Sequence, residues 1–169
     1  GLDLQFERLP APLPIWHACV TRDQWLAAAR AVASAGGRLV ATWGADRRER
    51  GGGFVVQAAY ALLDGLAWLD LALPGDTPSV PDLAPIFPAA ARMQRAAADL
   101  LGIATEGAAD NRPWLDHGVW PAGLHPLRHE ADVAAATAAP LPLPLDYPFV
   151  RVEGDGVHEI AVGPVHAGI

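Results

Sequence analysis

Two apolar segments on either side of a turn signal dominate the middle of this 169-residue chain. Residues 54–63 and 66–73 have strand composition, and the Asp64-Gly65 dipeptide between them favours the positive φ angles of a tight hairpin turn. Residues 38–43 also have strand composition, and the charged, glycine-rich stretch 46–53 that follows them indicates a turn. These three segments predict consecutive antiparallel strands of one sheet.

Periodicity and capping signals predict two helices. Thr21 and Gln24 have the spacing of a capping box, and apolar residues recur at helical period after them until Gly36-Gly37. Residues 89–101 are rich in alanine and leucine without an internal proline, and Gly102 follows where a helix C-cap is expected. Both helices need an apolar surface to cover, and the predicted sheet supplies it.

The predicted fold is therefore α+β, with a mixed or antiparallel sheet of about five strands and two main helices packed on one face. Residues 149–153 and 157–162 flank a second turn signal, Gly154-Asp155-Gly156, and are expected to form another hairpin. Residues 1–14 contain three prolines and are expected to have little regular structure. The domain is thus predicted to span residues 15–162.

The charge composition excludes several classes of function. All twelve cationic side chains are arginine, so neither a lysine Schiff base nor a Walker-type phosphate-binding loop can occur in this chain. A formal charge of -7 and a pI near 5.2 disfavour binding to nucleic acid, whose backbone selects basic surfaces. The sequence has neither an apolar run of about 18 residues nor a secretory signal pattern. We therefore expect a cytoplasmic chain without direct membrane insertion, with any membrane association made through partner subunits.

The cysteine and tryptophan residues bear on cofactors and on packing. Cys19 is the single cysteine, which is too few for a metal–sulfur cluster. We expect a buried structural thiol, because free cysteine is among the most buried residue types, although a pair with His17 is an alternative if a strand places both on one face. No catalytic, metal-binding or cofactor-binding residue is predicted. Three of the six tryptophans are expected on core faces of predicted elements: Trp25, Trp43 and Trp68.

Two segments resemble one known family, in the same order along the chain. The first contains Pro78-Ser79-Val80, Ile86–Ala90, Arg95 and Asp99–Ile103. It is similar to the signature of the thirty-kilodalton hydrophilic subunit of respiratory NADH dehydrogenase and of its relative fused to formate-hydrogenlyase-type hydrogenases. In that signature a Pro-Ala-Ala stretch precedes Glu-Arg-Glu and Asp-Leu-Phe-Gly-Ile. The triplet here reads Gln94-Arg95-Ala96, which keeps the arginine alone.

The second segment, Arg112–Arg128, resembles the Trp-Pro-x-Gly-x-His-Pro-Leu-Arg stretch that follows in the same family. The closing run Val162–Ile169 resembles the junction at which the nickel-binding domain of energy-converting nickel–iron hydrogenase large subunits begins. Residues 163–169 are accordingly expected to begin a linker to a large-subunit domain.

The resemblance implies a thirty-kilodalton-subunit-like domain, the N-terminal domain of a formate-hydrogenlyase or hydrogenase-4-type large subunit. Such a domain is non-catalytic and braces the large catalytic subunit of an oxidoreductase complex for electron transfer. The implied partner is a large subunit or fused domain that carries the nickel-binding or quinone site. Six residues are candidates for docking: Arg95, Asp99, Trp114, Trp120, His125 and Arg128.

Other interpretations remain open at this point. One is an independent metal-binding or small-molecule enzyme that uses His117, His125 and His129, since imidazoles with nearby carboxylates can hold zinc or iron. Another is a degenerate paralogue that kept the fold and lost its partner, which the missing glutamates beside Arg95 suggest. Arg95 and Asp99 lie four residues apart, a spacing typical of a surface ion pair.

A charged turn also has two interpretations. Arg47, Arg48, Glu49 and Arg50 are typical of a solvated turn, and guanidinium groups can instead pair with carboxylates of a partner.

Overall fold

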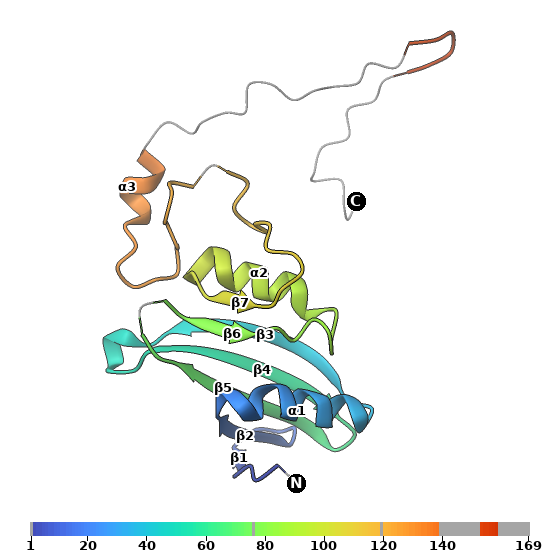
Figure 1. The fold of residues 1–169 in the computed structure, drawn as a ribbon, viewed down its shortest axis with the longest axis vertical. Coiled ribbons are helices and arrows are strands. Elements are labelled where there is room, and N and C mark those ends of the chain that lie inside the picture. The colour runs from blue at the N-terminus through green and yellow to red at the C-terminus, as the bar shows by residue number, and fades with distance from the viewer. Residues whose placement is uncertain (1, 76, 119, 139–152, 159–169) are drawn as a thin grey trace.

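The structure is a computed structural model that describes residues 2–75, 77–118, 120–138 and 153–158. Its main element is a five-stranded sheet in the spatial order β1-β2-β5-β4-β3 (Figure 1). The strands are β1 (Glu7–Leu9), β2 (Ile15–Val20), β3 (Arg38–Asp46), β4 (Phe54–Leu62) and β5 (Gly65–Leu73). The predicted sheet of about five strands is confirmed, but β1 and β2 were not among the predicted strands, and β1 lies in residues 1–14, where little regular structure was expected.

The pairing of these strands makes the sheet mixed. β3, β4 and β5 form the predicted antiparallel meander, whereas β2 runs parallel to β5 and β1 is antiparallel to β2. The hairpin turn is one residue earlier than predicted, because Leu62 pairs with Gly65 and the loop is Leu63-Asp64. Gly65 has φ 139° and lies so close to Pro14 that a Cβ there would be 2.3 Å from the Pro14 oxygen.

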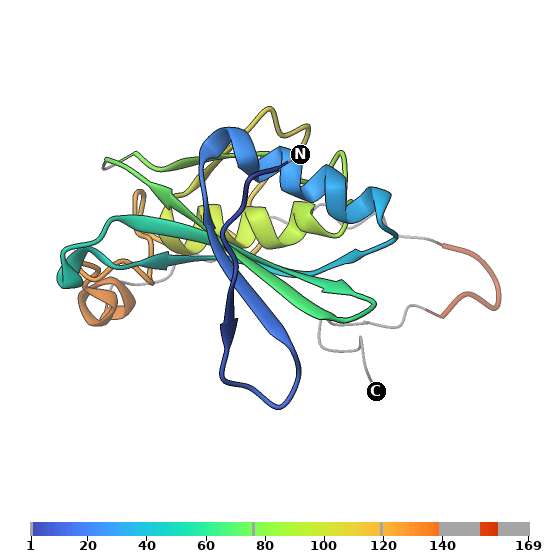
Figure 2. The same cartoon turned by 90° about the horizontal axis from the view of Figure 1, so that it is seen from below.

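Two helices cover one face of the sheet, as predicted (Figure 2). α1 (Arg22–Ser34) begins with the expected capping box, in which the Thr21 side chain accepts from the Gln24 amide and the Gln24 side chain accepts from the Thr21 amide. α2 (Ala90–Leu101) ends at Gly102, whose left-handed φ of 68° is the conformation that favours glycine.

Shorter elements complete the described part of the chain. β6 (Ser79–Pro81) and β7 (Ala104–Glu106) form a small parallel sheet before and after α2. The charged turn contains a 3-10 helix, η1 (Arg48–Arg50), and the short helix α3 (Val133–Ala138) follows the loop segment. Most of the predicted C-terminal hairpin lies outside the described residues, as does the expected linker at 163–169; the turn at 154–157 is described and has a Val157 N–H to Gly154 carbonyl bond.

The core lies between the sheet and the two helices. Alternate β4 side chains enter it, from Phe54 to Tyr60, and meet Trp25 of α1 and Leu101 of α2. Gly44 of β3 allows α2 and the residues after it to approach, because a Cβ there would lie 2.5 Å from the Ile103 Cδ1. Burying this apolar face against the helices is the main stabilising contribution to such a layered fold.

The prediction for two tryptophans was wrong. Trp25 is fully buried in the core, but Trp43 and Trp68 lie on the sheet face turned away from the helices, where their rings meet edge to face at 5.6 Å. Cys19 is exposed and not the buried thiol that we expected. His17 and Cys19 do share this open face, because both belong to β2 with one residue between them.

A carboxylate organises the open face. One oxygen of Asp70 accepts hydrogen bonds from Gln57 Nε2 at 2.8 Å and from Trp68 Nε1 at 2.7 Å. The other lies 3.3 Å from Arg47 and 3.6 Å from His17 Nε2. Arg47 is therefore tied to the sheet and is not a freely solvated turn residue.

Candidate docking surface

The predicted docking residues gather around α2 and the loop segment that follows β7. Arg95, on the solvent side of α2, donates to the carbonyl oxygens of Arg112 at 2.5 Å and Pro113 at 3.0 Å. Its remaining nitrogen pairs with Asp110 at 3.0 Å. The predicted surface pair between Arg95 and Asp99 is wrong, because each of these side chains binds the loop instead.

Asp99 binds the same loop through amide groups. A single carboxylate oxygen accepts from the backbone N–H of Trp114 at 2.7 Å, Leu115 at 2.6 Å and Asp116 at 3.3 Å. Charge-assisted hydrogen bonds of this kind are stronger than neutral ones. Arg95 satisfies carbonyl groups and Asp99 satisfies amides, so the two side chains together fix the conformation of residues 112–116.

Residues 125–128 cap the C-terminal end of α2. The carbonyl groups of Asp99, Leu100 and Leu101 have no partner within a helix that stops at Leu101. They accept from the His125 imidazole at 2.9 Å, the Leu127 amide at 3.0 Å and the Arg128 guanidinium at 2.8 Å, respectively. Since a carbonyl oxygen only accepts, Nδ1 of His125 carries a proton.

The two loop tryptophans differ in their surroundings. Trp114 is 39% exposed, and the guanidinium carbons of Arg92 and Arg95 lie 4.9 and 5.4 Å from its ring centroid. Trp120 is half-buried, and its amide lies 3.4 Å from the Asp116 carboxylate. Both indoles thus keep part of their surface available to solvent or to a partner.

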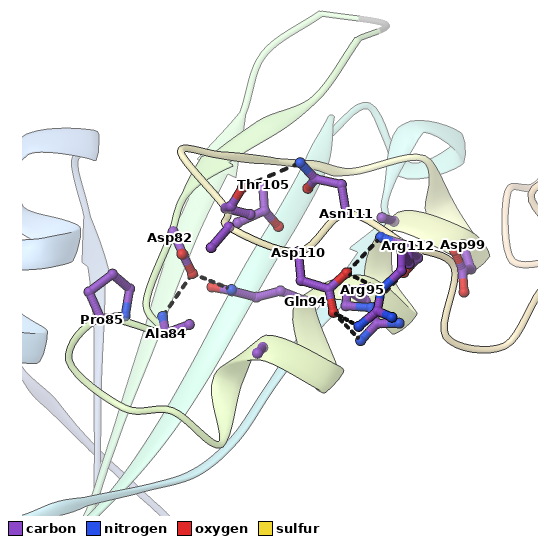
Figure 3. A pocket seen from close by; sticks show the side chains of 14 residues that line it. Asp82, Ala84, Pro85, Gln94, Arg95, Asp99, Thr105, Asp110, Asn111 and Arg112 are labelled. Carbon is purple, nitrogen blue, oxygen red and sulfur yellow. Dashed lines mark hydrogen bonds and ion pairs between the residues drawn. The ribbon is translucent and has the colours of Figure 1, made fainter.

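A hollow of about 310 Å³ lies beside these contacts, between α2 and the loop 108–112 (Figure 3). Ala91 and Ala98 of α2 and Ala84 and Pro85 of the preceding turn line it with small apolar groups. Gln94 lies behind them, where its amide nitrogen donates to Asp82 at 2.6 Å and its oxygen accepts from the Leu83 amide at 2.8 Å.

An ion-pair cluster fixes the far end of the loop segment to β3. Arg48 donates to both oxygens of Asp46, at 2.9 and 2.6 Å, and to Glu130 at 2.6 Å, and it stacks on Phe54 at 4.4 Å. His129 lies 3.1 Å from Asp46. The Arg48 guanidinium holds the pKa of Asp46 well below its usual range, and it also lowers the pKa of Glu130.

The proposed histidine metal site is not formed in the described part of the chain. His125 binds the end of α2 and His129 binds Asp46, while His117 is exposed and joins neither. Ligand atoms of Asp46, His129 and Glu130 do lie within 4.8 Å of one another. Arg48 already occupies both carboxylates, and its charge opposes a divalent cation there.

Several residues of this surface had no signal in the sequence. Asp110 and Arg112 pair with each other, and Arg92 stacks on Trp114, but all three depend on the path of a loop that periodicity does not describe. The Asp110–Arg112 pair lowers the pKa of the Asp110 carboxyl. Asp82 comes close to Gln94 only when the turn 82–89 is folded, so the sequence did not indicate this contact.

Comparison with known proteins assigns the family. The family model described as "Respiratory-chain NADH dehydrogenase, 30 Kd subunit" matches residues 18–137. The chain belongs to this family. The match includes both α2 and the loop segment, so the residues described above are part of the family domain.

Similar proteins include two from Escherichia coli. Formate hydrogenlyase subunit 5 is 28% identical over 135 residues, which is 78% of this chain and 24% of that protein. Hydrogenase-4 component G is 28% identical over 134 residues, which is 77% of this chain and 24% of that protein. The chain therefore spans about a quarter of the length of these relatives.

Two solved structures share the fold. A trypsin-resistant fragment of Nqo5 superposes with a TM-score of 0.55 at 21% identity, over 63% of this chain and 89% of that chain. A chain of an archaeal membrane-bound sulfane sulfur reductase superposes with a TM-score of 0.61 at 16% identity, over 92% of this chain and 91% of that one. Within the described residues, none of the helices has the length and apolar character needed to cross a bilayer.

Proposed function

We propose that this chain is a non-catalytic structural and assembly domain of a complex related to NADH dehydrogenase or to energy-converting hydrogenases. It braces the large catalytic subunit, or a large-subunit domain fused to it, in a position suited to electron transfer. The observation that carries the proposal is the network of hydrogen bonds that attaches residues 112–116 and 125–128 to α2, in the segment that carries Trp114 and Trp120. An ordered loop loses little conformational entropy when a partner binds.

The relatives support a role within an assembly. Their names assign them to formate hydrogenlyase, to hydrogenase-4 and, for a 60-residue match at 35% identity in Pyrococcus furiosus, to a membrane-bound hydrogenase. Attachment to the membrane would then occur through partner subunits. The geometry also disfavours the alternative of an independent metalloenzyme, since His117, His125 and His129 have three different environments.

Substitution of Trp120 by glutamate tests this proposal. Burying a carboxylate in a docked interface is costly, and a tryptophan hot spot is worth about 2 kcal/mol or more, so we expect about thirtyfold weaker binding. The measurement is the dissociation constant between this chain and a separately produced large subunit or large-subunit domain.

Trp16→Glu is the matched control, because Trp16 is 43% exposed and lies on β2, far from the loop segment (Figure 1). We expect it to bind like the unmodified protein. Equal affinities for the Trp120 variant and the unmodified protein would refute docking through this segment.

A further inference from the structure

Alanine and proline side chains form part of the wall of the hollow beside α2, and two of its polar side chains already have hydrogen-bond partners. Gln94 is 5% exposed and uses both ends of its amide, one on Asp82 and one on Leu83. One oxygen of the Asp99 carboxylate accepts from three backbone amides. Thr105 and Asn111 also line the hollow, but most of the lining left for a ligand is alanine and proline, which favours an apolar group.

The hollow continues into a more open groove along α2, which ends at Trp114. Ala91, Arg95, Asp110 and Arg112 line both, so the two form one depression. The hollow is also lined by Asp82 and Asp99, but in the groove Arg92, Arg95 and Arg112 face the single carboxylate of Asp110. This local surplus of positive charge contrasts with the net charge of -7 of the whole chain.

Two of these guanidinium groups are available to a partner. Arg92 is exposed and touches the Trp114 ring, and no carboxylate lies within ion-pair distance of it in the part of the chain that the structure describes. Arg112 pairs with Asp110, yet its side chain is 81% exposed. Arginine presents a planar fork of donors that matches carboxylate geometry, and a neighbouring aromatic ring orients it.

We propose that this depression receives an acidic segment of the partner subunit, with carboxylates on Arg92 and Arg112 and an apolar side chain in the 310 Å³ hollow. The inference rests on the proposed function and names the chemistry of the partner surface. Apolar anchors in pockets surrounded by complementary charge are typical of protein interfaces.

Reversal of one charge tests the electrostatic part. Arg92→Glu should weaken binding of the full-length large subunit on the order of tenfold at low salt, mainly through slower association, and added salt should reduce the difference. The control is Arg30→Glu, an equal charge change at an exposed position of α1 outside the depression, which should bind like the unmodified protein. Unchanged binding by Arg92→Glu, or an equal loss in both variants, would overturn the inference.

Filling the hollow tests the apolar part. Ala98→Leu should occupy the space that the partner side chain needs and weaken binding at least about fivefold, while the thermal midpoint of the isolated chain stays the same or rises. If a folded Ala98→Leu variant binds the large subunit normally, the hollow does not receive an apolar side chain of the partner.

A photo-reactive side chain at Ala91 identifies the partner segment by mass spectrometry. Cross-links to a segment in which Asp and Glu outnumber Lys and Arg support the inference, and cross-links to a basic segment contradict it. Loss of binding in Trp120→Glu with normal binding in both Arg92→Glu and Ala98→Leu would leave the proposed function standing and remove this inference. Normal binding in all three variants would remove both.

Discussion

At the residue scale, Asp46 makes the stability of the folded protein depend on pH. Its side chain is 2% exposed and accepts from Arg48 and His129, so the folded state holds its pKa below the ordinary value of 3.8. A carboxyl whose pKa is lowered by folding binds fewer protons in the native state, and its stabilising contribution is complete above about pH 4 and lost as the pH falls further.

Asp46→Asn should lower the free energy of unfolding at pH 7 by about 2 kcal/mol, because Arg48 loses its charged partner. The same variant should show a weaker fall in stability between about pH 4 and pH 2, measured by urea unfolding at each pH. Asp64→Asn, in the exposed hairpin turn, is the control with little expected effect. If the stability of Asp46→Asn falls with pH as steeply as that of the unmodified protein, other carboxyl groups cause the fall.

Two buried hydroxyl groups give a contrasting pair of expectations. The Tyr60 hydroxyl has no hydrogen-bond partner among the described residues, and burial raises its pKa above the ordinary value of 10.0. The Thr42 hydroxyl donates to the Gln57 carbonyl at 2.8 Å. Tyr60→Phe should therefore leave stability unchanged or raise it by up to about 1 kcal/mol, whereas Thr42→Val should cost about 1 kcal/mol. Chemical denaturation measures both, and a large loss in Tyr60→Phe would reveal a partner for that hydroxyl.

At the element scale, α2 and the loop segment depend on each other. The helix supplies Arg95 and Asp99 to the loop, and the loop returns His125 and Arg128 to the last carbonyl groups of the helix. This exchange holds residues 112–116 and 125–128 in place without regular secondary structure. Because one Asp99 oxygen accepts from three loop amides, the conformation of the loop depends strongly on this single side chain.

Asp99→Ala should release that loop. We expect a loss of about 2 kcal/mol in the stability of the segment and correspondingly faster hydrogen exchange at the Trp114 and Leu115 amides. The Val56 amide in β4 is the internal control and should keep its protection. Equal acceleration at all three amides would indicate global destabilisation in place of local release.

Elements with local signals were predictable, and those that depend on distant partners were not. The capping box of α1 and the glycine end of α2 lie within a few residues of their helices, so their spacing alone identified them. The order of β2 beside β5 is a pairing across about 50 residues, which no local pattern encodes. Trp43 and Trp68 alternate correctly along their strands, but alternation does not tell which face the helices cover.

In the candidate docking surface, too, the sequence indicated residues within motifs but not the contacts that depend on distant parts of the chain. The family motifs identified Arg95, Asp99, His125 and Arg128, which all contact α2 or its loop in the structure. Their actual partners are backbone groups of a loop, and the spacing of four between Arg95 and Asp99 suggested a mutual pair instead. Arg92 and the hollow became visible only with the loop in place.

At the scale of the whole molecule, the parallel pairing of β2 with β5 sets an order of events during synthesis. β2 is synthesised before β5, and Val20 can pair with Leu71 only after β5 has left the ribosome. At about 5–20 residues per second, the delay is about 3 to 10 seconds. During that interval β2 can pair only with β1, and β5 then joins this hairpin to β4 and β3.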